Sequence, residues 1–354
     1  MHVYAAEDPA VMVRRPNRSI EGEAQGRQFR QALTAAVAYY SEDKTMEAIA
    51  RELDVSRSTV SRLLAHAREV GLVEIKVARP ELRATAIERR LQATYGVEAT
   101  VVTVPEGTGP EERHARTAAY AAEHLREVVG HDTVLAVAWG TMVNAISYRL
   151  KSKAVTNCKL VQLNGIGHGS GIGVHYAHAM MNRYAEAFRA NVQQFPAPIF
   201  FDSPQLKRLS SAESIFSHVR QLGEKAGVML FSVGTVSTGV PSSPHLYGSF
   251  LTDQDFAQLE QDGAVGDIGT TFFDEKGDCS AIRINDRSTG PDLAKMKHIP
   301  HRICVVSGTH KTEAVHGALR GGHISELIID EVTAQALLTR TSGSAGNGVV
   351  AVSA

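Results

Sequence analysis

Six polar side chains at helical spacing give the clearest chemical signal in this chain. They fall within residues 56–66, SRSTVSRLLAH, which read as one helix. Arginine can bond guanine edges or phosphate oxygens, and hydroxyls can bond base edges or phosphates, so the exposed face indicates contact with double-stranded DNA. The residues expected on that face are Arg57, Ser58, Thr59, Ser61, Arg62 and His66.

Two packed helices must position this polar face. Apolar residues recur at helical spacing over 46–53 and again over 60–64, so the two stretches can pack together around a turn at Val55. Asp54 tolerates the left-handed backbone of such a turn, and Ser56 is a suitable N-cap for the second helix. The pattern predicts a helix-turn-helix, with an ordinary helical hairpin as the alternative. Gly71 and the alternating strand Val73–Val77 indicate a winged variant.

Two strand-to-helix junctions farther along could bind an anion. Gly140 and Thr141 follow one predicted strand, where a helix start presents free amides and a hydroxyl. Gly308 and Lys311 follow another, and a lysine in a first helical turn opposes the helix dipole unless an anion lies beside it. We interpret both junctions as phosphate-binding, while an ordinary surface lysine remains the alternative for Lys311.

Asp267 is a third candidate, because it lies among glycines just before the apolar run Thr270–Phe273. A carboxylate there can accept hydrogen bonds from two sugar hydroxyls. The alternative is a turn aspartate that bonds its own backbone.

The glycine-rich stretch 165–173 does not fit a nucleotide loop. It contains no GxGxxG window, and no GK[ST] sequence occurs anywhere in the chain, so no cofactor is expected. His168, His175 and His178 lack a neighbouring carboxylate or cysteine, so no metal site is expected either.

Strands alternate with helices after about residue 97, which indicates an α/β fold. The expected strands are Thr100–Val104, Thr133–Ala138, Leu160–Leu163, Val228–Val233, Arg302–Ser307 and Glu326–Asp330. We expect a disordered arm over 1–27, the winged helix-turn-helix over 28–80, a linking or dimerising helix over 81–96, the α/β domain over 97–340 and a loose tail over 341–354.

Composition favours a cytoplasmic protein. The 354 residues carry a net charge of −1, so DNA affinity must come from a local basic surface. Three widely spaced cysteines, Cys158, Cys279 and Cys304, suit a reducing compartment. Neither a membrane-spanning apolar run nor a signal-type start is visible, so we expect no membrane partner.

In the order of these segments the chain resembles the SorC family of sugar-binding bacterial transcriptional regulators. The resemblance rests on residues 56–64, Trp139-Gly140-Thr141, Leu160–Gly165, Gly263–Ile268 with Phe272-Phe273-Asp274, and Gly308 with Lys311. It implies a Rossmann-like, doubly wound effector domain similar to sugar-phosphate isomerases, and a tetramer. It further implies that Gly140, Thr141 and Lys311 hold a phosphate, that Asp267 holds a sugar hydroxyl, and that Asn164 and Gly165 line the pocket.

Two hypotheses follow. The first is a regulator whose operator binding is controlled by a sugar, polyol or sugar-phosphate effector. The second is an isomerase-like enzyme with Asp267 as general base, or with His175 or His245 in that role. The helix-turn-helix has no purpose in the second.

Overall fold

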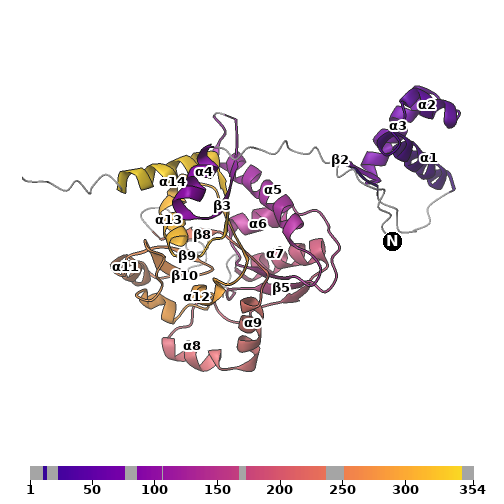
Figure 1. The fold of residues 1–354 in the computed structure, drawn as a ribbon. Coiled ribbons are helices and arrows are strands. Elements are labelled where there is room, and N and C mark those ends of the chain that lie inside the picture. Colours follow the sequence, from indigo (N-terminus) through magenta and orange to yellow (C-terminus); the bar gives the residue numbers. More distant parts are fainter. Residues whose placement is uncertain are drawn as a thin grey trace, which may run out of the picture. The chain divides into compact units, whose positions relative to one another are not determined.

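The computed structural model describes residues 11–13, 23–75, 86–105, 107–166, 173–236 and 251–344. They divide into two compact units, Met1–Arg83 and Ala84–Ala354, drawn in Figure 1. His168, His245 and positions 345–354 of the expected tail lie outside the described residues. Among those described, no helix combines the length and apolarity needed to cross a membrane.

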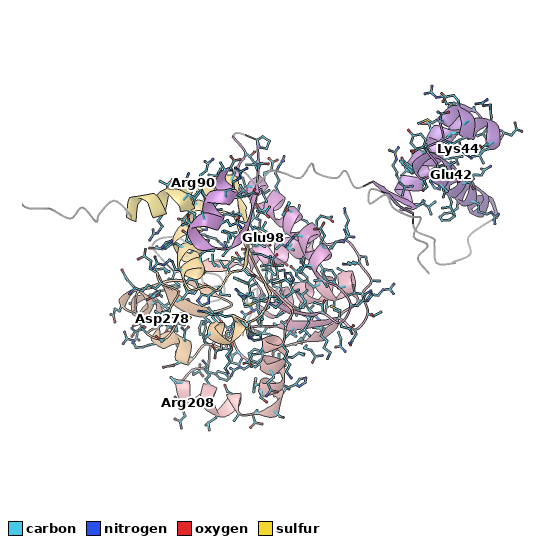
Figure 2. The ribbon with its side chains drawn as sticks, viewed as in Figure 1. Glu42, Lys44, Arg90, Glu98, Arg208 and Asp278 are labelled. Carbon is cyan, nitrogen blue, oxygen red and sulfur yellow. The ribbon has the colours of Figure 1, made fainter. Side chains whose placement is uncertain are left out.

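The first unit is a three-helix bundle around a small apolar core. Its helices are α1 (Glu23–Tyr40), α2 (Met46–Glu52) and α3 (Arg57–Glu69). The predicted stripes form this core, because Ile49, Val60 and Leu64 are buried against alanines of α1. Lys44, labelled beside Glu42 in Figure 2, joins the α1–α2 connection to α2 through ion pairs with Glu42 (3.1 Å) and Glu52 (2.9 Å).

The turn between α2 and α3 has the predicted chemistry. Asp54 adopts a left-handed backbone with φ 52°, and Ser56 caps α3 by accepting a hydrogen bond from the Thr59 amide at 3.1 Å. Thr45 caps α2 in the same way. The helix-turn-helix geometry is therefore set by local sequence.

The wing differs from the expectation in the origin of its second strand. β2 (Val73–Ile75) lies within the predicted strand, and it pairs antiparallel with β1 (Val11–Val13). β1 falls inside the stretch expected to be disordered, and α1 also begins within that stretch, at Glu23.

The second unit is built on a seven-stranded parallel sheet with the order β3-β12-β11-β7-β4-β5-β6. All seven strands are parallel, and the strand order changes direction beside β4, as it does in doubly wound folds. This order confirms the predicted fold class. The strands are β3 (Glu98–Val102), β4 (Val134–Val137), β5 (Lys159–Gln162), β6 (Asn191–Gln193), β7 (Val228–Phe231), β11 (His301–Val306) and β12 (Glu326–Asp330).

Helices cover both faces of this sheet, so the strands are buried on both sides. Leu135 and Val137 of β4 join one apolar cluster, and Ala136 between them joins the other, as strand alternation requires. The helices are α4 (Ala86–Tyr95), α5 (Pro110–Val128), α6 (Thr141–Ser147), α7 (Gly173–Phe188), α8 (Pro204–Ser211), α9 (Ser214–Glu224), α11 (Asp253–Gln261), α12 (Leu293–Met296), α13 (Thr312–Arg320) and α14 (Glu331–Ser344), with short 3-10 helices η1 (Arg283–Asp286) and η2 (Thr309–Lys311).

A three-stranded antiparallel sheet was not predicted. It contains β8 (Val233–Thr235), β9 (Ala264–Ile268) and β10 (Thr271–Asp274) in the order β10-β9-β8. The strand expected over 228–233 breaks at Ser232, so that its first part stays in the large sheet and its end enters the small one. Gly266 keeps β9 close to α13, since a Cβ there would lie 2.5 Å from the Ala314 Cβ.

The predicted linking helix packs on the second unit. Leu91 of α4 is fully buried in an apolar cluster of that unit, and the Val101 amide donates to Glu88 Oε1 at 2.9 Å. α4 is therefore held by β3, the strand that follows it.

Candidate functional site

A small cavity lies beyond the carboxyl ends of β4, β5 and β7, where open α/β sheets bind their ligands. It encloses about 50 Å³, room for a few water molecules or one phosphate-sized group. Five predicted effector-binding residues line it, whereas Gly165 and Gly308 do not. The lining residues are Ala138, Trp139, Gly140, Thr141, Val143, Asn164, Ile199, Ser232, Val233, Gly234, Asp267, Gly269, Thr270 and Lys311.

Gly140 and Thr141 form the junction between β4 and α6. Gly140 is the N-cap of α6 and has no side chain, so no N-cap side chain accepts a hydrogen bond from the first amides of this helix. An extended backbone and open space around a notional Cβ show that the position does not require glycine sterically. The Tyr176 hydroxyl donates to the Gly140 carbonyl at 3.3 Å, which anchors the junction to α7.

Asp267 is a buried strand residue rather than part of a loop before a strand. It lies in β9 opposite Gly234 of β8 and is 5% exposed. A Cβ on Gly234 would lie 1.9 Å from Asp267 Oδ1, so the glycine makes room for the carboxylate. Asp267 Oδ2 also accepts a hydrogen bond from the Thr270 amide at 2.8 Å. Asp267 thus accepts a backbone hydrogen bond within the β9–β10 turn, as expected for a turn aspartate, and it also lines the cavity.

Lys311 ends η2 and brings a positive charge to the cavity. Its Nζ donates to the Val233 carbonyl at 3.0 Å. Burial lowers the pKa of Lys311, while Cys304 and Asp267 act in the opposite direction. Burial also lowers the pKa of His114, and the charges of Lys311 and Arg149 lower it further, so cationic groups gather at this end of the sheet. A bound anion would favour the charged form of Lys311.

Two polar oxygens in the lining have no hydrogen-bond partner among the described residues. They are Asn164 Oδ1 and Ser232 Oγ, both buried. Asn164 is only 1% exposed. A buried polar atom without a partner costs about 1–3 kcal/mol, and a ligand hydroxyl could satisfy either atom. The cavity is therefore equipped for a polyhydroxylated ligand.

Gly165 supports the cavity without lining it. Its carbonyl accepts from Trp139 Nε1 at 2.9 Å, and its amide donates to Thr289 Oγ1 at 3.1 Å. A Cβ there would lie 2.3 Å from the Pro198 carbonyl oxygen, so only glycine fits. This close packing holds the indole of Trp139 against the cavity.

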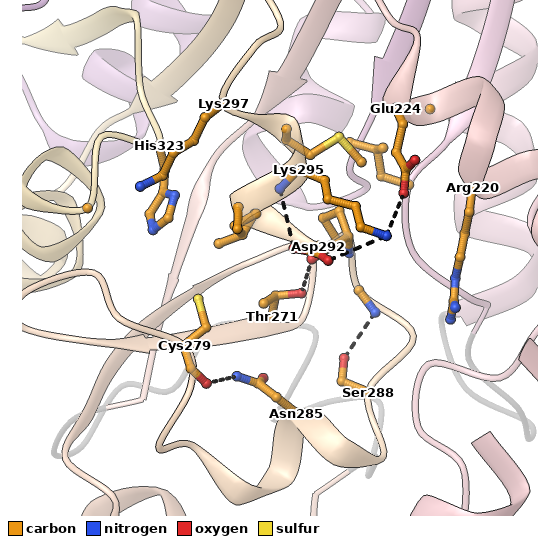
Figure 3. Close-up of a pocket in the computed structure, with 18 of the residues that line it drawn as sticks. Arg220, Glu224, Thr271, Cys279, Asn285, Ser288, Asp292, Lys295, Lys297 and His323 are labelled. Carbon is orange, nitrogen blue, oxygen red and sulfur yellow. Dashed lines mark hydrogen bonds and ion pairs between the residues drawn. The ribbon is translucent and has the colours of Figure 1, made fainter. Parts of the chain in front are cut away.

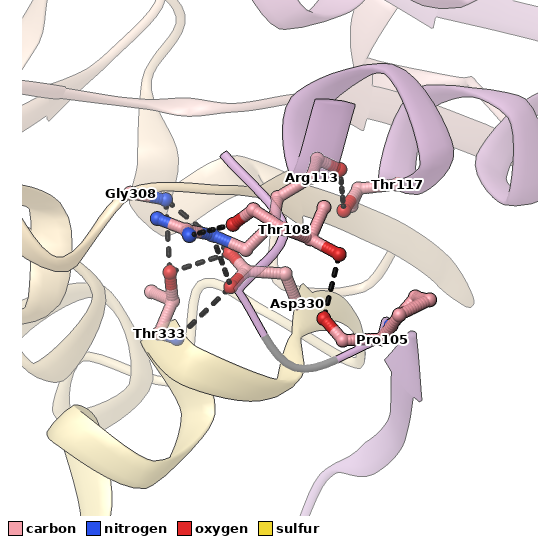
Figure 4. Close-up of polar contacts among 7 residues, drawn as sticks. All are labelled: Pro105, Thr108, Arg113, Thr117, Gly308, Asp330 and Thr333. Atoms are coloured by element: carbon pink, nitrogen blue, oxygen red, sulfur yellow. Dashed lines mark hydrogen bonds and ion pairs between the residues drawn. The ribbon is translucent and has the colours of Figure 1, made fainter. Parts of the chain in front are cut away.

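Gly308 uses its amide inside the protein (Figure 4). The amide donates to Thr333 Oγ1 at 2.8 Å and to Asp330 Oδ2 at 3.3 Å. Asp330 is fully buried and lies 3.5 Å from Arg113 Nε. With φ 119°, Gly308 occupies a conformation that favours glycine. Gly308 therefore lies outside the cavity lining, and its observed contacts shape the turn that carries Lys311; its contact with the effector stays a prediction.

Trp139, Ser232 and Thr270 are cavity residues that the sequence analysis did not select. Ser232 directly follows β7, so inspection of every strand end would have found it. The position of Thr270 in the lining depends on the β9–β10 pairing, which no sequence pattern indicated. Among the grouped histidines, His178 Nδ1 accepts from Gln194 Nε2 at 2.7 Å, and the described residues contain no cluster of metal ligands.

The predicted DNA-contacting residues all lie on α3. Arg57, Ser58, Ser61 and Arg62 are exposed, and Thr59 and His66 are partly exposed. The hydroxyls of Ser58 and Thr59 lie 2.7 and 2.9 Å from Ser56 Oγ. Arg57 Nε forms an ion pair with Glu47 Oε1 at 2.8 Å. The arginines and Ser61 are thus presented on one helical surface, and the other two hydroxyls also help to cap the helix.

Comparison with known proteins agrees with both units. Residues 80–339 match the family described as "Putative sugar-binding domain". The chain is 34% identical to the deoxyribonucleoside regulator of Bacillus subtilis (strain 168), over 87% of this chain and 96% of the relative. It is 25% identical to the sorbitol operon regulator of Klebsiella pneumoniae, over 86% and 96%.

Solved structures show the same fold. A domain of a "possible sugar-binding transcriptional regulator" from Arthrobacter aurescens TC1 is 34% identical, with a TM-score of 0.68 over 74% of this chain and all of that one. Full-length SorC from Klebsiella pneumoniae is 23% identical, with a TM-score of 0.63 over 88% of this chain and 99% of that one. With the cavity and the helix-turn-helix, these matches show that the chain belongs to the SorC family of sugar-binding transcriptional regulators.

Proposed function

We propose that the cavity binds part of a sugar or polyol phosphate effector and that this binding controls the affinity of α3 for operator DNA. The observation that carries the proposal is the convergence on one cavity of a partly buried lysine, a buried carboxylate and two oxygens that have no hydrogen-bond partner among the described residues. Lys311 with Thr141 and the α6 amides would hold the phosphate. Asp267, Asn164 and Ser232 would accept hydrogen bonds from hydroxyls.

The chemistry of the relatives is consistent with such a ligand. One relative is named for deoxyribonucleosides and another for sorbitol, and both names refer to hydroxylated compounds. The cavity of about 50 Å³ fits one functional group, so a whole sugar phosphate would extend beyond it. We therefore assign it to the charged end of the ligand and the hydroxyls nearest to it.

The proposed DNA site is the exposed surface of α3. Arg57 and Arg62 would contact base edges or phosphates, and Ser58, Thr59, Ser61 and His66 would add shorter contacts. A homo-oligomer with two such helices would favour an operator of two-fold symmetry. Effector control needs only a different effector affinity in the two DNA-binding states, commonly about 1–3 kcal/mol.

The test of the effector site is thermal stabilisation of the full chain by a panel of free and phosphorylated sugars and polyols. We expect stabilisation by a phosphorylated compound, lost in Lys311→Met and kept in Lys159→Met. Lys159 is the matched control because it is exposed at the opposite end of β5. Stabilisation by free sugars alone, or equal loss in both variants, would contradict the phosphate assignment.

The test of the DNA site compares two exposed arginines in different units. Arg62→Ala should abolish operator binding without changing effector binding, and Arg90→Ala, on α4, should change neither. Loss of both activities in Arg62→Ala would contradict the division of labour.

The enzymatic alternative has a direct test as well. The relatives described above are named as regulators, so the comparisons give the isomerase reading no support. Turnover of any sugar phosphate by the wild-type chain that is lost in Asp267→Asn would favour the enzyme over the regulator.

A further inference from the structure

A second, larger cavity opens on the sheet face that carries α9 and α12 (Figure 3). It encloses about 720 Å³, within the range of small-molecule sites. It shares no lining residue with the small cavity at the strand ends. Its walls come from the end of β5, from α8, α9 and α12, and from the loops that follow β10 and α13. The two cavities can therefore be tested by separate substitutions.

The lining of this cavity is unusually cationic for a chain with a net charge of −1. Three acidic side chains oppose six lysines and arginines: Lys207, Arg220, Lys276, Lys295, Lys297 and Arg320. Two of the acids already share a cation, because Lys295 Nζ lies 3.5 Å from Glu224 and 3.8 Å from Asp292. The third, Asp278, accepts hydrogen bonds from Ser280. The net charge of the cavity lining is therefore positive.

Lys207 and Arg220 are the two partly buried members of this cationic set, whereas the other four are exposed. Within the described part of the chain, neither has an ion pair with a carboxylate. Lys207 Nζ donates to the Asn285 carbonyl at 2.6 Å, and the Arg220 guanidinium lies 5.7 Å from the centre of the Phe195 ring. In Figure 3 Arg220 lies apart from the group formed by Lys295, Asp292 and Glu224.

Burial disfavours both charges. It lowers the pKa of Lys207, which the charge of Arg220 lowers further, while Asp286 and Asp292 act in the opposite direction. Burial also lowers the pKa of Arg220, against the influence of Glu224 and Asp292. Two partly desolvated cations that repel each other are stabilised by an anion placed between them.

His323 supplies a second, independent polar feature of the lining. Its side chain is 6% exposed, and its Nε2 donates to the Gly277 carbonyl at 2.8 Å. That bond leaves Nδ1 as an acceptor, and Nδ1 is buried with no hydrogen-bond partner in the described part of the chain. A buried acceptor of this kind needs a donor such as a hydroxyl or an amine.

We infer that this cavity is a second ligand site, for a small organic anion whose phosphate or carboxylate group binds Lys207 and Arg220. A hydroxyl or amine of the same ligand donates to His323 Nδ1. The site is chemically separate from the effector cavity, and it does not depend on the function proposed for that cavity.

The test is calorimetric titration of the full chain with glycerol 3-phosphate, which carries both an anion and hydroxyl donors, in phosphate-free buffer of low salt. Lys207→Gln and Arg220→Gln should each weaken binding about tenfold or more, because a hydrogen bond to a charged group contributes about 1.5–3 kcal/mol. Arg208→Gln is the matched control, since Arg208 is exposed on α8, the helix that carries Lys207, and does not line the cavity (Figure 2). The same binding event should persist in Lys311→Gln.

A parallel titration with inorganic phosphate tests the role of His323. Glycerol 3-phosphate should bind more tightly than inorganic phosphate to the wild type, and His323→Phe should remove that difference. Both Lys207→Gln and Arg220→Gln are measured, so the test still has an outcome if one of the two variants fails to fold. The inference is overturned by absence of saturable binding in Lys311→Gln, by equal weakening in Arg208→Gln, or by a change of oligomeric state in Lys207→Gln, which would place the cations in a subunit interface.

Discussion

Replacement of Gly234 by alanine is the most direct steric probe of the effector cavity. Gly234 and Asp267 are cross-strand partners, so a Cβ added to Gly234 would project from the same face as the Asp267 side chain and lie 1.9 Å from Asp267 Oδ1. Real Cβ contacts essentially never fall below 3.0 Å, so the carboxylate must move by roughly 1 Å or the two strands must separate. Either response disturbs the carboxylate that we assign to a ligand hydroxyl.

The size of the effect follows from the contacts that move. Overpacking of this kind costs about 1–3 kcal/mol of stability. The bond from the Thr270 amide to Asp267 Oδ2, 2.8 Å long, is lost or weakened with it. A ligand hydroxyl bonded to a carboxylate contributes about 1.5–3 kcal/mol, so effector affinity should fall about 10- to 140-fold.

Two measurements check this prediction. Urea unfolding gives the change in free energy of unfolding, and calorimetric titration with the compound found in the stabilisation panel gives the change in affinity. Gly227→Ala is the matched control, because a Cβ on Gly227 meets no atom within 4 Å. If Gly234→Ala loses no more stability and affinity than Gly227→Ala, Asp267 does not contact the effector from the position described.

Three further predictions concern other parts of the chain. Glu47→Gln should tighten operator binding by up to about fivefold, because a surface ion pair is worth about 0–1 kcal/mol and its loss frees Arg57 for DNA; electrophoretic mobility shift at low salt measures this. His124→Gln should cost more stability near pH 5.5 than near pH 8, measured by urea unfolding. The hydrogen bond to Glu326 raises the pKa of His124, so its contribution is fully present below the unfolded pKa of about 6.5 and disappears as pH rises through the folded-state value. Leu91→Ala should lower the free energy of unfolding of the second unit by about 2–5 kcal/mol, because the side chain is fully buried; urea unfolding of the full chain reports it.

Each of these changes has a control close by. Glu52→Gln removes a carboxylate of α2 that pairs with Lys44, so it should change operator affinity less than Glu47→Gln does. His131→Gln changes an exposed histidine bonded to Thr156, and an equal pH dependence in it would contradict the assignment to Glu326. Arg90→Ala, beside Leu91 but exposed, should stay within about 0.5 kcal/mol of the wild type.

The parts of the fold that sequence predicted are those set by short-range rules. Capping by Ser56 and the left-handed Asp54 depend on residues within three positions, and both occur as predicted. Strand β12 occurs as predicted, because its apolar run is buried on both faces. By contrast, β6 and the β8–β10 sheet were missed, since strands of three to five residues carry little periodicity, and glycines in β8 and β9 weaken it further.

The residues of the candidate site also divide into those predicted from short-range rules and those set by tertiary contacts. The strand-end rule selected Gly140, Thr141 and Lys311, the family resemblance added Asn164, and the structure brings all four to one cavity. Gly308 obeys the same rule but has its amide taken by Thr333, which lies 25 positions away. No local sequence pattern indicates that Thr333 would occupy this amide in place of a ligand.

The sequence by itself therefore determined the helix-turn-helix, the alternating α/β pattern and most of the residues at the strand ends, because helix caps, turn residues and hydrophobic periods act over a few neighbouring positions. Only the tertiary structure decided that Asp267 faces Gly234, that oxygens of Ser232 and Asn164 find no partner among the residues described, and that Lys207 and Arg220 line a second cavity. These features arise where segments distant in sequence pack together, and their burial and charge depend on neighbours that no local spacing specifies.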